Sequence, residues 1–408
     1  MRESTDYDVA VIGGGLNGMT AALAVAACGF RVVVIEPRAT TYPLPDAFDP
    51  RNYAITQASI QILKNLGVWT YVDEQRNADI ERMEVWDANS RGRLEFSSGT
   101  ILAPRFGVIS EHANLGRALH QAIGGHAKVE FREAEVQDIN LEPDARELVF
   151  DDASRLRATL VLCVDGAWST NREKLGILST PVAYQQNALV CNVRTGKPHS
   201  NVARQVFQHE GPLAFLPLAD AHQSAIVWTN SVESAENLMA LDAHEFARRL
   251  ETAFGQTLGD IEVLSERFAF PLYKMHVSRY DAERAALVGD AAHVVHPLAG
   301  QGLNLGIMDA AVLAEVLAPL AERSKMPATN LRRALRRYSR WRAHDNALML
   351  HATDKLNQLF AQHAKPLQLA RGLGLNLTNK IPPLMRMFVQ HAVGKAGELP
   401  ALARADYR

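Results

Sequence analysis

The sequence Tyr7-Asp8-Val9-Ala10-Val11-Ile12-Gly13-Gly14-Gly15-Leu16-Asn17-Gly18 joins an apolar strand to a glycine-rich turn. The small residues from Met19 to Cys28 predict a helix, and the run from Arg31 to Ile35 predicts a second strand, which Glu36 closes. This order of elements, ending in an acidic residue, is typical of a dinucleotide-binding βαβ unit. The stretch therefore predicts a Rossmann-like parallel sheet.

The three glycines of the G-x-G-x-x-G pattern have different tasks in such a unit. Gly13 makes the turn, Gly15 lets the backbone approach a pyrophosphate, and Gly18 lets the helix pack closely on the strand. Glu36 is placed to accept hydrogen bonds from an adenosine ribose. We also expect Asn17, inside the pattern, to lie at the cofactor.

A second stretch, Ala286 to Asp309, joins a short buried strand to another glycine-rich segment. Gly289 interrupts the apolar run and Asp290 presents a carboxylate at the end of the strand. The run Gly300 to Asn304 is too rich in glycine to predict regular structure, so we expect the next helix to begin near Leu305. A carboxylate and a glycine-rich turn at a helix N-terminus suit a bound ligand, although an ordinary strand-loop-helix connection has the same pattern.

A third motif, Asp165-Gly166-x-x-Ser169-x-x-Arg172, lies between the other two. Together the motifs resemble those of the flavin-dependent aromatic hydroxylases, which are the p-hydroxybenzoate-hydroxylase-like monooxygenases. Within that superfamily the chain is similar, over nearly its whole length, to the ubiquinone-biosynthesis hydroxylases. The subfamily signs include Asp49-x-Arg51, the run Gly211 to Leu218, and Tyr338-x-x-x-Arg342.

The resemblance implies FAD as the cofactor, with Asp290 on its ribityl hydroxyls and the segment from Pro297 to Asn304 lining the isoalloxazine. Within that segment, Pro297, Gly300 and Gln301 are the implied catalytic residues. His112 departs from the family, where Gln or Asn often stands at this position. The implied FAD-binding residues are Gly13, Gly15, Asn17, Gly18, Glu36, Arg51, His112, Arg117, Asp165, Gly166, Asp290, Gly302, Leu303 and Asn304.

The resemblance also implies that NAD(P)H is a transient co-substrate, since no second G-x-G-x-x-G pattern follows a strand. The Asp165-Gly166 motif helps to bind it in the family, and Arg172 is the natural partner for a phosphate. We expect His293 and His296 to be structural histidines rather than proton carriers.

The implied reaction is hydroxylation of the aromatic ring of a polyprenylated phenol in ubiquinone biosynthesis, with NAD(P)H and O₂, through a flavin 4a-hydroperoxide. Such chemistry needs a dry pocket beside the flavin. We expect Pro217 and Leu218 to form its wall, although most apolar residues of that region are simply core. Three alternatives stay open: a monooxygenase of another small phenol, a flavin halogenase, and a non-catalytic flavoprotein scaffold. The absence of a Trp-x-Trp pair disfavours the halogenase, and the intact run Gly300 to Asn304 disfavours the scaffold.

The expected fold is α/β: a Rossmann-like FAD-binding domain, interleaved with an antiparallel-sheet substrate domain and followed by C-terminal helices. The predicted FAD-binding segments are 1–79, 111–180 and 281–325. Residues 80–110 and 181–280 are assigned to the substrate domain, and 326–408 to the C-terminal helical region. Residues 38–54 are expected to form an extended loop, and several short strands are expected to follow one another in the region 184–231.

Composition limits the partners and the location of the protein. The net charge of −2 on 408 residues provides no field that attracts nucleic acid, and Cys28, Cys163 and Cys191 have no metal-ligand or disulfide spacing. The absence of a signal pattern and of 18 consecutive apolar residues predicts a cytoplasmic protein. A basic stretch with Arg332, Arg333, Arg336, Arg337, Arg340 and Arg342, and an apolar segment from Leu384 to Val389, suggest peripheral contact with the inner membrane surface or a biosynthetic complex, although a solvated basic face is the default reading.

Overall fold

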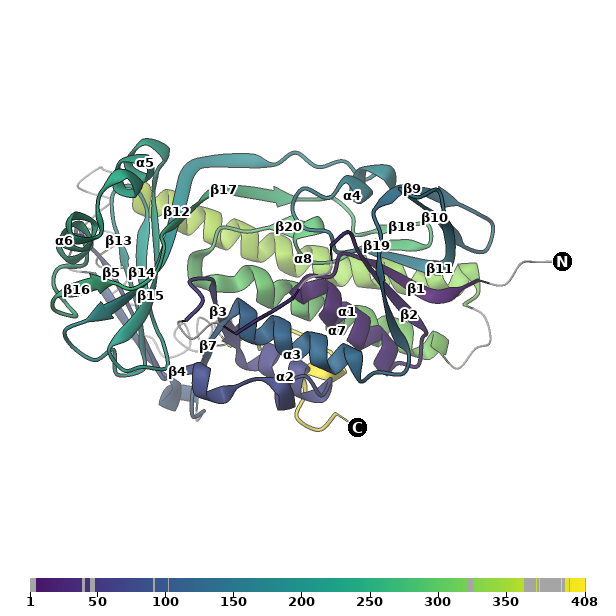
Figure 1. Cartoon of the computed structure of the whole chain (residues 1–408), viewed down its shortest axis with the longest axis horizontal. Coiled ribbons are helices and arrows are strands. Elements are labelled where there is room, and N and C mark those ends of the chain that lie inside the picture. The colour runs from purple at the N-terminus through teal and green to yellow at the C-terminus, as the bar shows by residue number, and fades with distance from the viewer. Residues whose placement is uncertain are drawn as a thin grey trace.

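A computed structural model describes residues 5–38, 41–44, 48–90, 92–101, 103–321, 326–362, 372, 374, 390, 393–395 and 397–407. Two large sheets lie at opposite ends of the molecule, and the long helix α8 (Ala328–Ala361) extends from one to the other (Figure 1). This α/β architecture, with a nucleotide-binding sheet and a second sheet built largely from antiparallel strands, confirms the predicted fold class.

The first sheet has eight strands in the order β18-β19-β11-β1-β2-β8, and β10 and β9 extend it beside β11. The pairs β19–β11, β11–β1, β1–β2 and β2–β8 are parallel. The central strands are buried on both faces, as their Val- and Ile-rich sequences require. The strands are β1 (Tyr7–Ile12), β2 (Val32–Glu36), β8 (Val129–Glu133), β9 (Val136–Leu141), β10 (Arg146–Phe150), β11 (Arg155–Cys163), β18 (Asp281–Ala282) and β19 (Ala285–Leu287).

The helices of this unit include α1, α7 and α8, which share one core cluster with the sheet. Two of them begin earlier than the sequence predicts: α1 begins at Leu16 and not at Met19, and α7 begins at Gln301 and not at Leu305. The glycines in both first turns are tolerated because packing outweighs their low helix propensity. The bounds are α1 (Leu16–Ala27), α2 (Gln57–Asn65), α3 (His112–Gly124), α4 (Thr170–Lys174) and α7 (Gln301–Ala321).

A separate three-stranded sheet contains β3 (Asn52–Thr56), β4 (Ala78–Ile80) and β7 (Gly107–Glu111) in the order β3-β7-β4. The expectation of a loop as far as residue 54 is therefore wrong, because β3 pairs along its whole length with β7. Thr56 then accepts a hydrogen bond from the Ser59 N–H and caps α2.

The second large sheet has nine strands in the order β20-β17-β12-β15-β14-β13-β5-β6, and β16 pairs with β12. Its pairs are antiparallel except for β13–β5. Two helices, α5 (Val232–Ala240) and α6 (Ala243–Phe254), lie on its outer side (Figure 1), and α5 was not predicted. The strands are β5 (Arg82–Asp87), β6 (Arg93–Ser97), β12 (Val182–Thr195), β13 (Val202–Phe207), β14 (Pro212–Pro217), β15 (Gln223–Ser231), β16 (Ile261–Val263), β17 (Phe268–His276) and β20 (His293–Val294).

Helix α7 is the one helix of the described residues that is long and apolar enough to cross a membrane, with a mean hydropathy of 1.6 over its best 18-residue window. That window is 72% buried inside the protein, however, so we assign α7 to the core. Of the three cysteines, Cys163 and Cys191 are buried and Cys28 is partly buried.

Candidate functional site

The three sequence motifs meet at the carboxyl edge of the eight-stranded sheet. Ile12 in β1 is in register with Ile35 in β2 and with Cys163 in β11, and Cys163 is in register with Leu287 in β19. The four strands therefore end at the same level and deliver their next residues to one edge. This edge is where parallel α/β sheets bind ligands.

The first glycine turn is compact on its inner side and open on its outer side. Gly13 has φ +109°, and a Cβ there would lie 2.5 Å from the Val164 carbonyl oxygen. A Cβ at Gly18 would lie 1.9 Å from the Gly13 oxygen, whereas one at Gly15 would meet nothing within 4 Å. The space at Gly15 borders the N-terminus of α1, where the helix dipole favours an anion.

We expect Gly18→Ala to lower the free energy of unfolding by about 1–3 kcal/mol, because the added methyl group overpacks the helix–strand contact. Gly124→Ala, at the end of α3, is the matched control, since a Cβ there meets nothing within 4 Å. Urea unfolding compares the two variants. Equal stability would show that the close approach of Gly18 to Gly13 is not required.

Glu36, at the end of β2, accepts a 2.6 Å hydrogen bond from the Gly14 N–H. Tyr42 lies near it: burial and the charge of Glu36 raise the pKa of Tyr42, and Arg51 opposes this shift. The Tyr42 ring also fills the space that Gly116 of α3 leaves, because a Cβ at Gly116 would lie 2.1 Å from it. Tyr42 therefore lies between the end of β2 and α3.

The region between Tyr42 and the end of β19 contains three further polar side chains, those of Arg51, Tyr53 and His112. The Arg51 side chain is about half exposed and pairs with Asp49, 3.2 Å away. The Tyr53 hydroxyl lies 3.4 Å from Nδ1 of His112, whose pKa is lowered by burial and by Arg51. Burial, followed by the charge of Asp290, raises the pKa of Tyr53 to about 12. The structure thus brings Arg51, His112 and Asp290 into one neighbourhood.

Arg117 follows His112 in α3, and its Nε atom is buried without a hydrogen-bond partner among the described residues. Asp290 is exposed, and yet protein atoms surround it closely enough to raise its pKa. His293 opposes that rise and Asp309 adds to it. Asp290 is therefore an accessible carboxylate that can accept hydrogen bonds from hydroxyl groups of a ligand.

The Asp165-Gly166 motif is held by its own helix turn. Asp165 accepts hydrogen bonds from the Ser169 hydroxyl at 2.6 Å and from Asn171 at 2.9 Å. Arg172 is 2% exposed and donates to the carbonyl oxygens of Ala167 and Ala291. Arg172 thus ties the Asp-Gly turn to the residue after Asp290. Its Nε atom is buried without a hydrogen-bond partner among the described residues, and the expectation that Arg172 binds a phosphate stays a prediction.

The predicted flavin-lining loop forms part of the α7 N-terminus. Because α7 begins at Gln301, the N–H groups of Gly302 and Leu303 belong to its first turn, where a helix offers no carbonyl partner. The Asn304 N–H, by contrast, is in register with the Gly300 carbonyl oxygen. A Cβ at Gly302 would meet nothing within 4 Å, while Gly300 has φ +61° and lies against Ala54. Pro297 precedes the short turn that leads to Gly300. The segment therefore places the first-turn N–H groups of Gly302 and Leu303 beside the open space at Gly302.

The Asn304 side chain is occupied within the protein. Its Oδ1 accepts from the Thr56 N–H at 3.0 Å, and its Nδ2 donates to the carbonyl oxygens of Ala54 at 2.7 Å and Gly300 at 3.0 Å. The side chain therefore fixes the loop on β3.

Asn17 occupies the gap between two glycines of the second stretch. A Cβ at Gly306 would lie 2.1 Å from its Nδ2 atom, and a Cβ at Gly289 would lie 2.8 Å from the same atom. Its Oδ1 atom is buried without a hydrogen-bond partner among the described residues. Asn17 therefore joins the first motif to the second and retains one unused acceptor.

Asp309 holds the second motif in place and is fully buried. It accepts hydrogen bonds from the Gly289 N–H at 3.0 Å, His293 Nε2 at 2.6 Å, Arg342 Nε at 2.6 Å and Asn346 Nδ2 at 3.1 Å. Burial alone raises the pKa of Asp309, but His293 and Arg342 outweigh it and hold the pKa well below its usual range. His293 thus has the expected structural role.

His296 has a different environment from His293. It is fully buried, neither ring nitrogen has a hydrogen-bond partner among the described residues, and its ring meets Tyr184 edge-on at 5.0 Å. Burial lowers the pKa of His296 to about 4, against a smaller opposing effect of Asp354. The imidazole is therefore neutral at pH 7.

This shift predicts a pH dependence of stability. Between pH 6.5 and about 4 the unfolded chain binds a proton at His296 that the folded chain does not, so the stability that is present above pH 6.5 is lost as the pH falls toward 4. We expect the fall in the free energy of unfolding at acid pH to be smaller in His296→Gln than in the wild type, by on the order of 1–3 kcal/mol. Urea unfolding at pH 7 and pH 4.5 measures it. Parallel pH profiles for the wild type and the variant would contradict the prediction.

The two expected pocket residues, Pro217 at the end of β14 and Leu218 directly after it, lie on different faces of the sheet. Leu213 and Phe215 pack with α6, and Pro217 has the same alternation. Leu216 and Leu218 belong to another cluster, which Ala54 borders, and Ala54 also touches the Gly300 position. Leu218 is therefore near the flavin-lining loop, whereas the alternation places Pro217 on the opposite face.

Sequence reasoning missed three contributors to this region: Tyr42, Tyr53 and Asn192. Asn192, 2% exposed in β12, donates to the Phe48 carbonyl oxygen at 2.9 Å and accepts from Asn52, which fixes the nine-stranded sheet on the segment carrying Arg51. The alternation of β12 could have indicated that Asn192 is a buried polar residue. Nothing local marks the two tyrosines.

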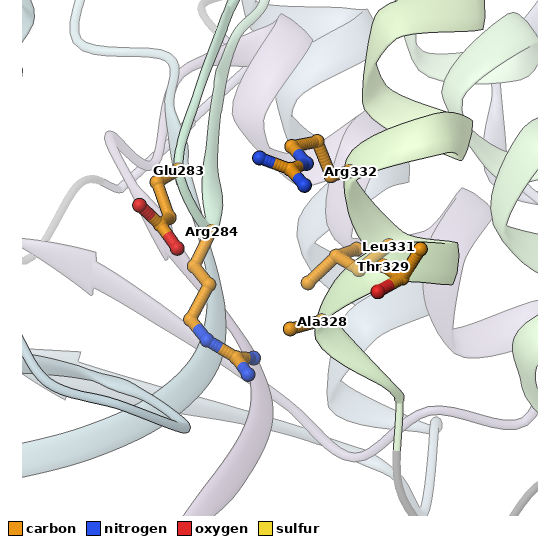
Figure 2. A pocket seen from close by; sticks show the side chains of 6 residues that line it. All are labelled: Glu283, Arg284, Ala328, Thr329, Leu331 and Arg332. Atoms are coloured by element: carbon orange, nitrogen blue, oxygen red, sulfur yellow. The ribbon is translucent and has the colours of Figure 1, made fainter.

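A small cavity of about 100 Å³ lies between the turn that joins β18 to β19 and the start of α8 (Figure 2). It opens at the amino end of β19, opposite the edge that carries Asp290, so it is separate from the candidate site. Its lining residues are Glu283, Arg284, Ala328, Thr329, Leu331 and Arg332.

The basic stretch predicted near the C-terminus lies on α8. Five of its arginines are exposed, but Arg342 is 3% exposed and bound to Asp309. Residues 384–389, which suggested an apolar membrane face, lie outside the described residues.

Comparison with known proteins identifies the family. Residues 6–329 match the model of the FAD-binding domain called FAD_binding_3. The chain is 35% identical to the ubiquinone hydroxylase UbiL of Rhodospirillum rubrum, covering 97% of this chain and 92% of the relative. The chain belongs to the FAD-dependent ubiquinone hydroxylases. Another such relative, the 3-demethoxyubiquinol 3-hydroxylase of Escherichia coli, is 33% identical over 95% of this chain and 98% of its own.

Solved structures show the same fold. The p-nitrophenol 4-monooxygenase PnpA of Pseudomonas putida superimposes with a TM-score of 0.77 at 20% identity, covering 97% of this chain and 100% of its own. PqsL of Pseudomonas aeruginosa, a probable FAD-dependent monooxygenase, gives 0.75 at 25% identity, covering 91% and 100%.

The residues at the sheet edge of this ubiquinone hydroxylase fit FAD. Open space remains at Gly15 and Gly302, both beside helix N-termini, and Asp290 is an accessible acceptor at the next strand end. The buried but unpartnered atoms of Asn17 and Arg117 are further polar groups that a cofactor with many hydroxyl and phosphate groups satisfies.

Proposed function

We propose that this ubiquinone hydroxylase inserts one oxygen atom into the aromatic ring of a polyprenylated phenol, using FAD, NAD(P)H and O₂. The observation that carries the proposal is a series of neighbouring polar side chains that leads from Glu36 to Asp290 and ends near the N-terminus of α7. This N-terminus adjoins an apolar cluster that includes Ala54 and Leu218. The names of the relatives, including the ubiquinone hydroxylase of Rhodospirillum rubrum, support this substrate class.

The residues of the chain have separate tasks in this reaction. Glu36 and Asp290 would accept hydrogen bonds from hydroxyl groups of the cofactor, and the first-turn N–H groups of α7, at the positive end of the helix dipole, would bind its ring. When bound, FAD supplies the oxygen-transfer chemistry. The cluster around Leu218 excludes water from the reacting ring. We assign Pro297, Gly300 and Gln301 to the loop that orients the ring.

A second candidate is a monooxygenase acting on another small aromatic substrate. It is favoured by the structural similarity to PqsL, which has been solved in complex with 2-aminobenzoylacetate, a substrate-sized aromatic without a prenyl chain. The two candidates share the cofactor site and differ in what the apolar region accepts.

The test of the proposed function supplies labelled O₂ to the holoenzyme with NADH or NADPH and with prenylated or tail-less phenols. We expect one labelled oxygen atom in the product and faster turnover of the prenylated substrate, measured by mass spectrometry. Oxygen derived from water would refute the monooxygenase. Equal turnover of both phenols would favour the second candidate.

We further propose that segments 1–79, 111–180 and 281–325 act as the FAD-binding domain, that 80–110 and 181–280 form the substrate domain, and that 326–408 form the C-terminal region. We place the enzyme on the cytoplasmic side of the inner membrane as a peripheral protein. A lipid-like substrate supports this location, as do the five exposed arginines of α8, which suit an anionic surface.

A further inference from the structure

Four buried polar atoms without a hydrogen-bond partner among the described residues lie close together beside the flavin-lining loop. They are the Tyr184 hydroxyl, both ring nitrogens of His296, and Oδ1 of Asp354. These residues come from β12, from the position just before Pro297, and from α8. The four atoms are therefore brought together only by tertiary packing.

The three side chains interact with one another. The rings of Tyr184 and His296 meet at 5.0 Å with an interplanar angle of 80°, and the charge of Asp354 acts on both groups. The Tyr184 hydroxyl faces Asp354 closely enough that this carboxylate, after burial, raises the pKa of Tyr184, although the two side chains do not meet the geometry of a hydrogen bond. The second oxygen of Asp354 accepts hydrogen bonds from Lys274 in β17 at 2.9 Å and from Gln358 at 3.0 Å. Lys274 thus balances the Asp354 charge and leaves one oxygen of the carboxylate unused.

A purely structural explanation is costly. A buried polar group without a partner costs about 1–3 kcal/mol, and native proteins keep few of them. Four such atoms in adjacent side chains indicate that a polar group of a ligand completes their hydrogen bonds.

The surroundings of this cluster suit an aromatic ligand. Leu298, two residues after His296, packs with Phe207 and Phe360, whose rings stack at 3.8 Å. Phe360 lies on α8 beyond Asp354, so the same helix covers the polar and the apolar part. A ligand with an apolar body and one polar group matches this arrangement.

The hydrogen-bond donors and acceptors of these three side chains determine which polar group of a ligand can bind there. A neutral imidazole has one donor and one acceptor, the tyrosine hydroxyl can do either, and the carboxylate only accepts. A hydroxyl group can donate to one acceptor of this set and accept from one donor, and it can bond to one ring nitrogen of His296 only. A carboxylate ligand would be repelled by Asp354. We propose that Tyr184, His296 and Asp354 form the binding site for a ring hydroxyl of the phenolic substrate. This proposal rests on the proposed function and adds positioning residues to it.

The first test compares binding of a substrate phenol and of its methyl ether to the FAD-loaded enzyme by titration calorimetry. We expect Tyr184→Phe to reduce the preference for the phenol over the ether by about 10-fold, because the lost hydrogen bond is made only by the hydroxyl. Its thermal stability should change little, since no hydrogen bond of good geometry to another described residue is lost in the free protein. If Tyr184 had only a structural role, Tyr184→Phe would lose thermal stability and keep the wild-type preference for the phenol over the ether.

Tyr338→Phe is the matched control. The Tyr338 hydroxyl is buried and donates to the Leu287 carbonyl oxygen at 2.7 Å, so this variant should lose stability and keep the wild-type preference for the phenol. His296→Gln retains a donor and an acceptor, and should keep more of the preference than His296→Leu.

An unchanged preference in both Tyr184→Phe and His296→Leu, with wild-type enzyme that binds and hydroxylates the phenol, would overturn the assignment of this site. A wild-type enzyme that neither binds nor hydroxylates any phenol would instead overturn the proposed function, and the assignment with it. The wild-type measurement therefore separates the two failures.

Discussion

Asp309→Ala is expected to lower the free energy of unfolding by about 3–5 kcal/mol, the cost of removing one partner from a buried ion pair. The substitution leaves the guanidinium of Arg342 and the ring of His293, both almost fully buried, without their main acceptor. It also frees the Gly289 N–H, so the turn that carries Asp290 should loosen. Urea unfolding followed by far-UV circular dichroism measures the change.

Asp345→Ala is the control for this prediction, because Asp345 also pairs with Arg342, at 3.2 Å, but its side chain is 41% exposed. Exposed pairs of this kind contribute about 0–1 kcal/mol. Similar losses in the two variants would mean that burial does not set the strength of the Asp309 network.

Asp290→Ala is expected to weaken FAD binding by about 10- to 100-fold, since a hydrogen bond to a charged group contributes about 1.5–3 kcal/mol. The carboxylate is exposed, and Gly289, Ala291 and Arg172 already fix the backbone around it. The fold should therefore survive the change. Flavin fluorescence during titration of the apoprotein gives the dissociation constant.

Asp290→Asn keeps an acceptor and should lose less affinity. Asp281→Ala tests for a general effect of charge, because Asp281 lies in β18, paired with Ala286, away from the end of β19. An FAD affinity of Asp290→Ala equal to that of the wild type would leave Asp290 as a turn residue only.

Both substitutions act on the turn after β19, but through different properties. Asp309 contributes through buried hydrogen bonds to the protein, so its loss should appear without FAD. Asp290 contributes through a ligand, so its loss should appear mainly in the FAD titration. Measuring each variant with and without FAD separates the two roles.

The sequence predicted the elements that depend on local backbone chemistry. Gly13 has the left-handed conformation that its turn requires, and Gly18 permits an approach that no Cβ allows. The apolar strands before Gly13, Asp165 and Gly289 pair in parallel, which brings their carboxyl ends to one edge. Because such features recur wherever this βαβ arrangement is used, the motifs were sufficient to predict the fold class and FAD.

Local patterns misjudged or missed features that depend on distant partners. The glycines at 300 and 302 suggested a loop, but Asn304 bonds to Ala54 and Thr56 of β3 and helps to hold the first turn of α7 in place. Arg172 has the charge to bind a phosphate, but no local pattern indicated that its guanidinium also donates to two carbonyl oxygens. Whether a residue is buried depends on how it packs against elements that are distant in the sequence, and its sequence neighbours do not determine this packing.

The sequence by itself therefore determined the fold class, the sheet edge at which the motifs meet, and FAD as the cofactor. Tertiary structure alone decided which distant side chains meet: Asp309 pairs with Arg342, and Tyr184 and His296 lie beside Asp354. Both groups depend on the packing of α8 against the rest of the chain. Hydrogen bonding and burial between residues so far apart in the sequence are fixed only when the complete core has formed.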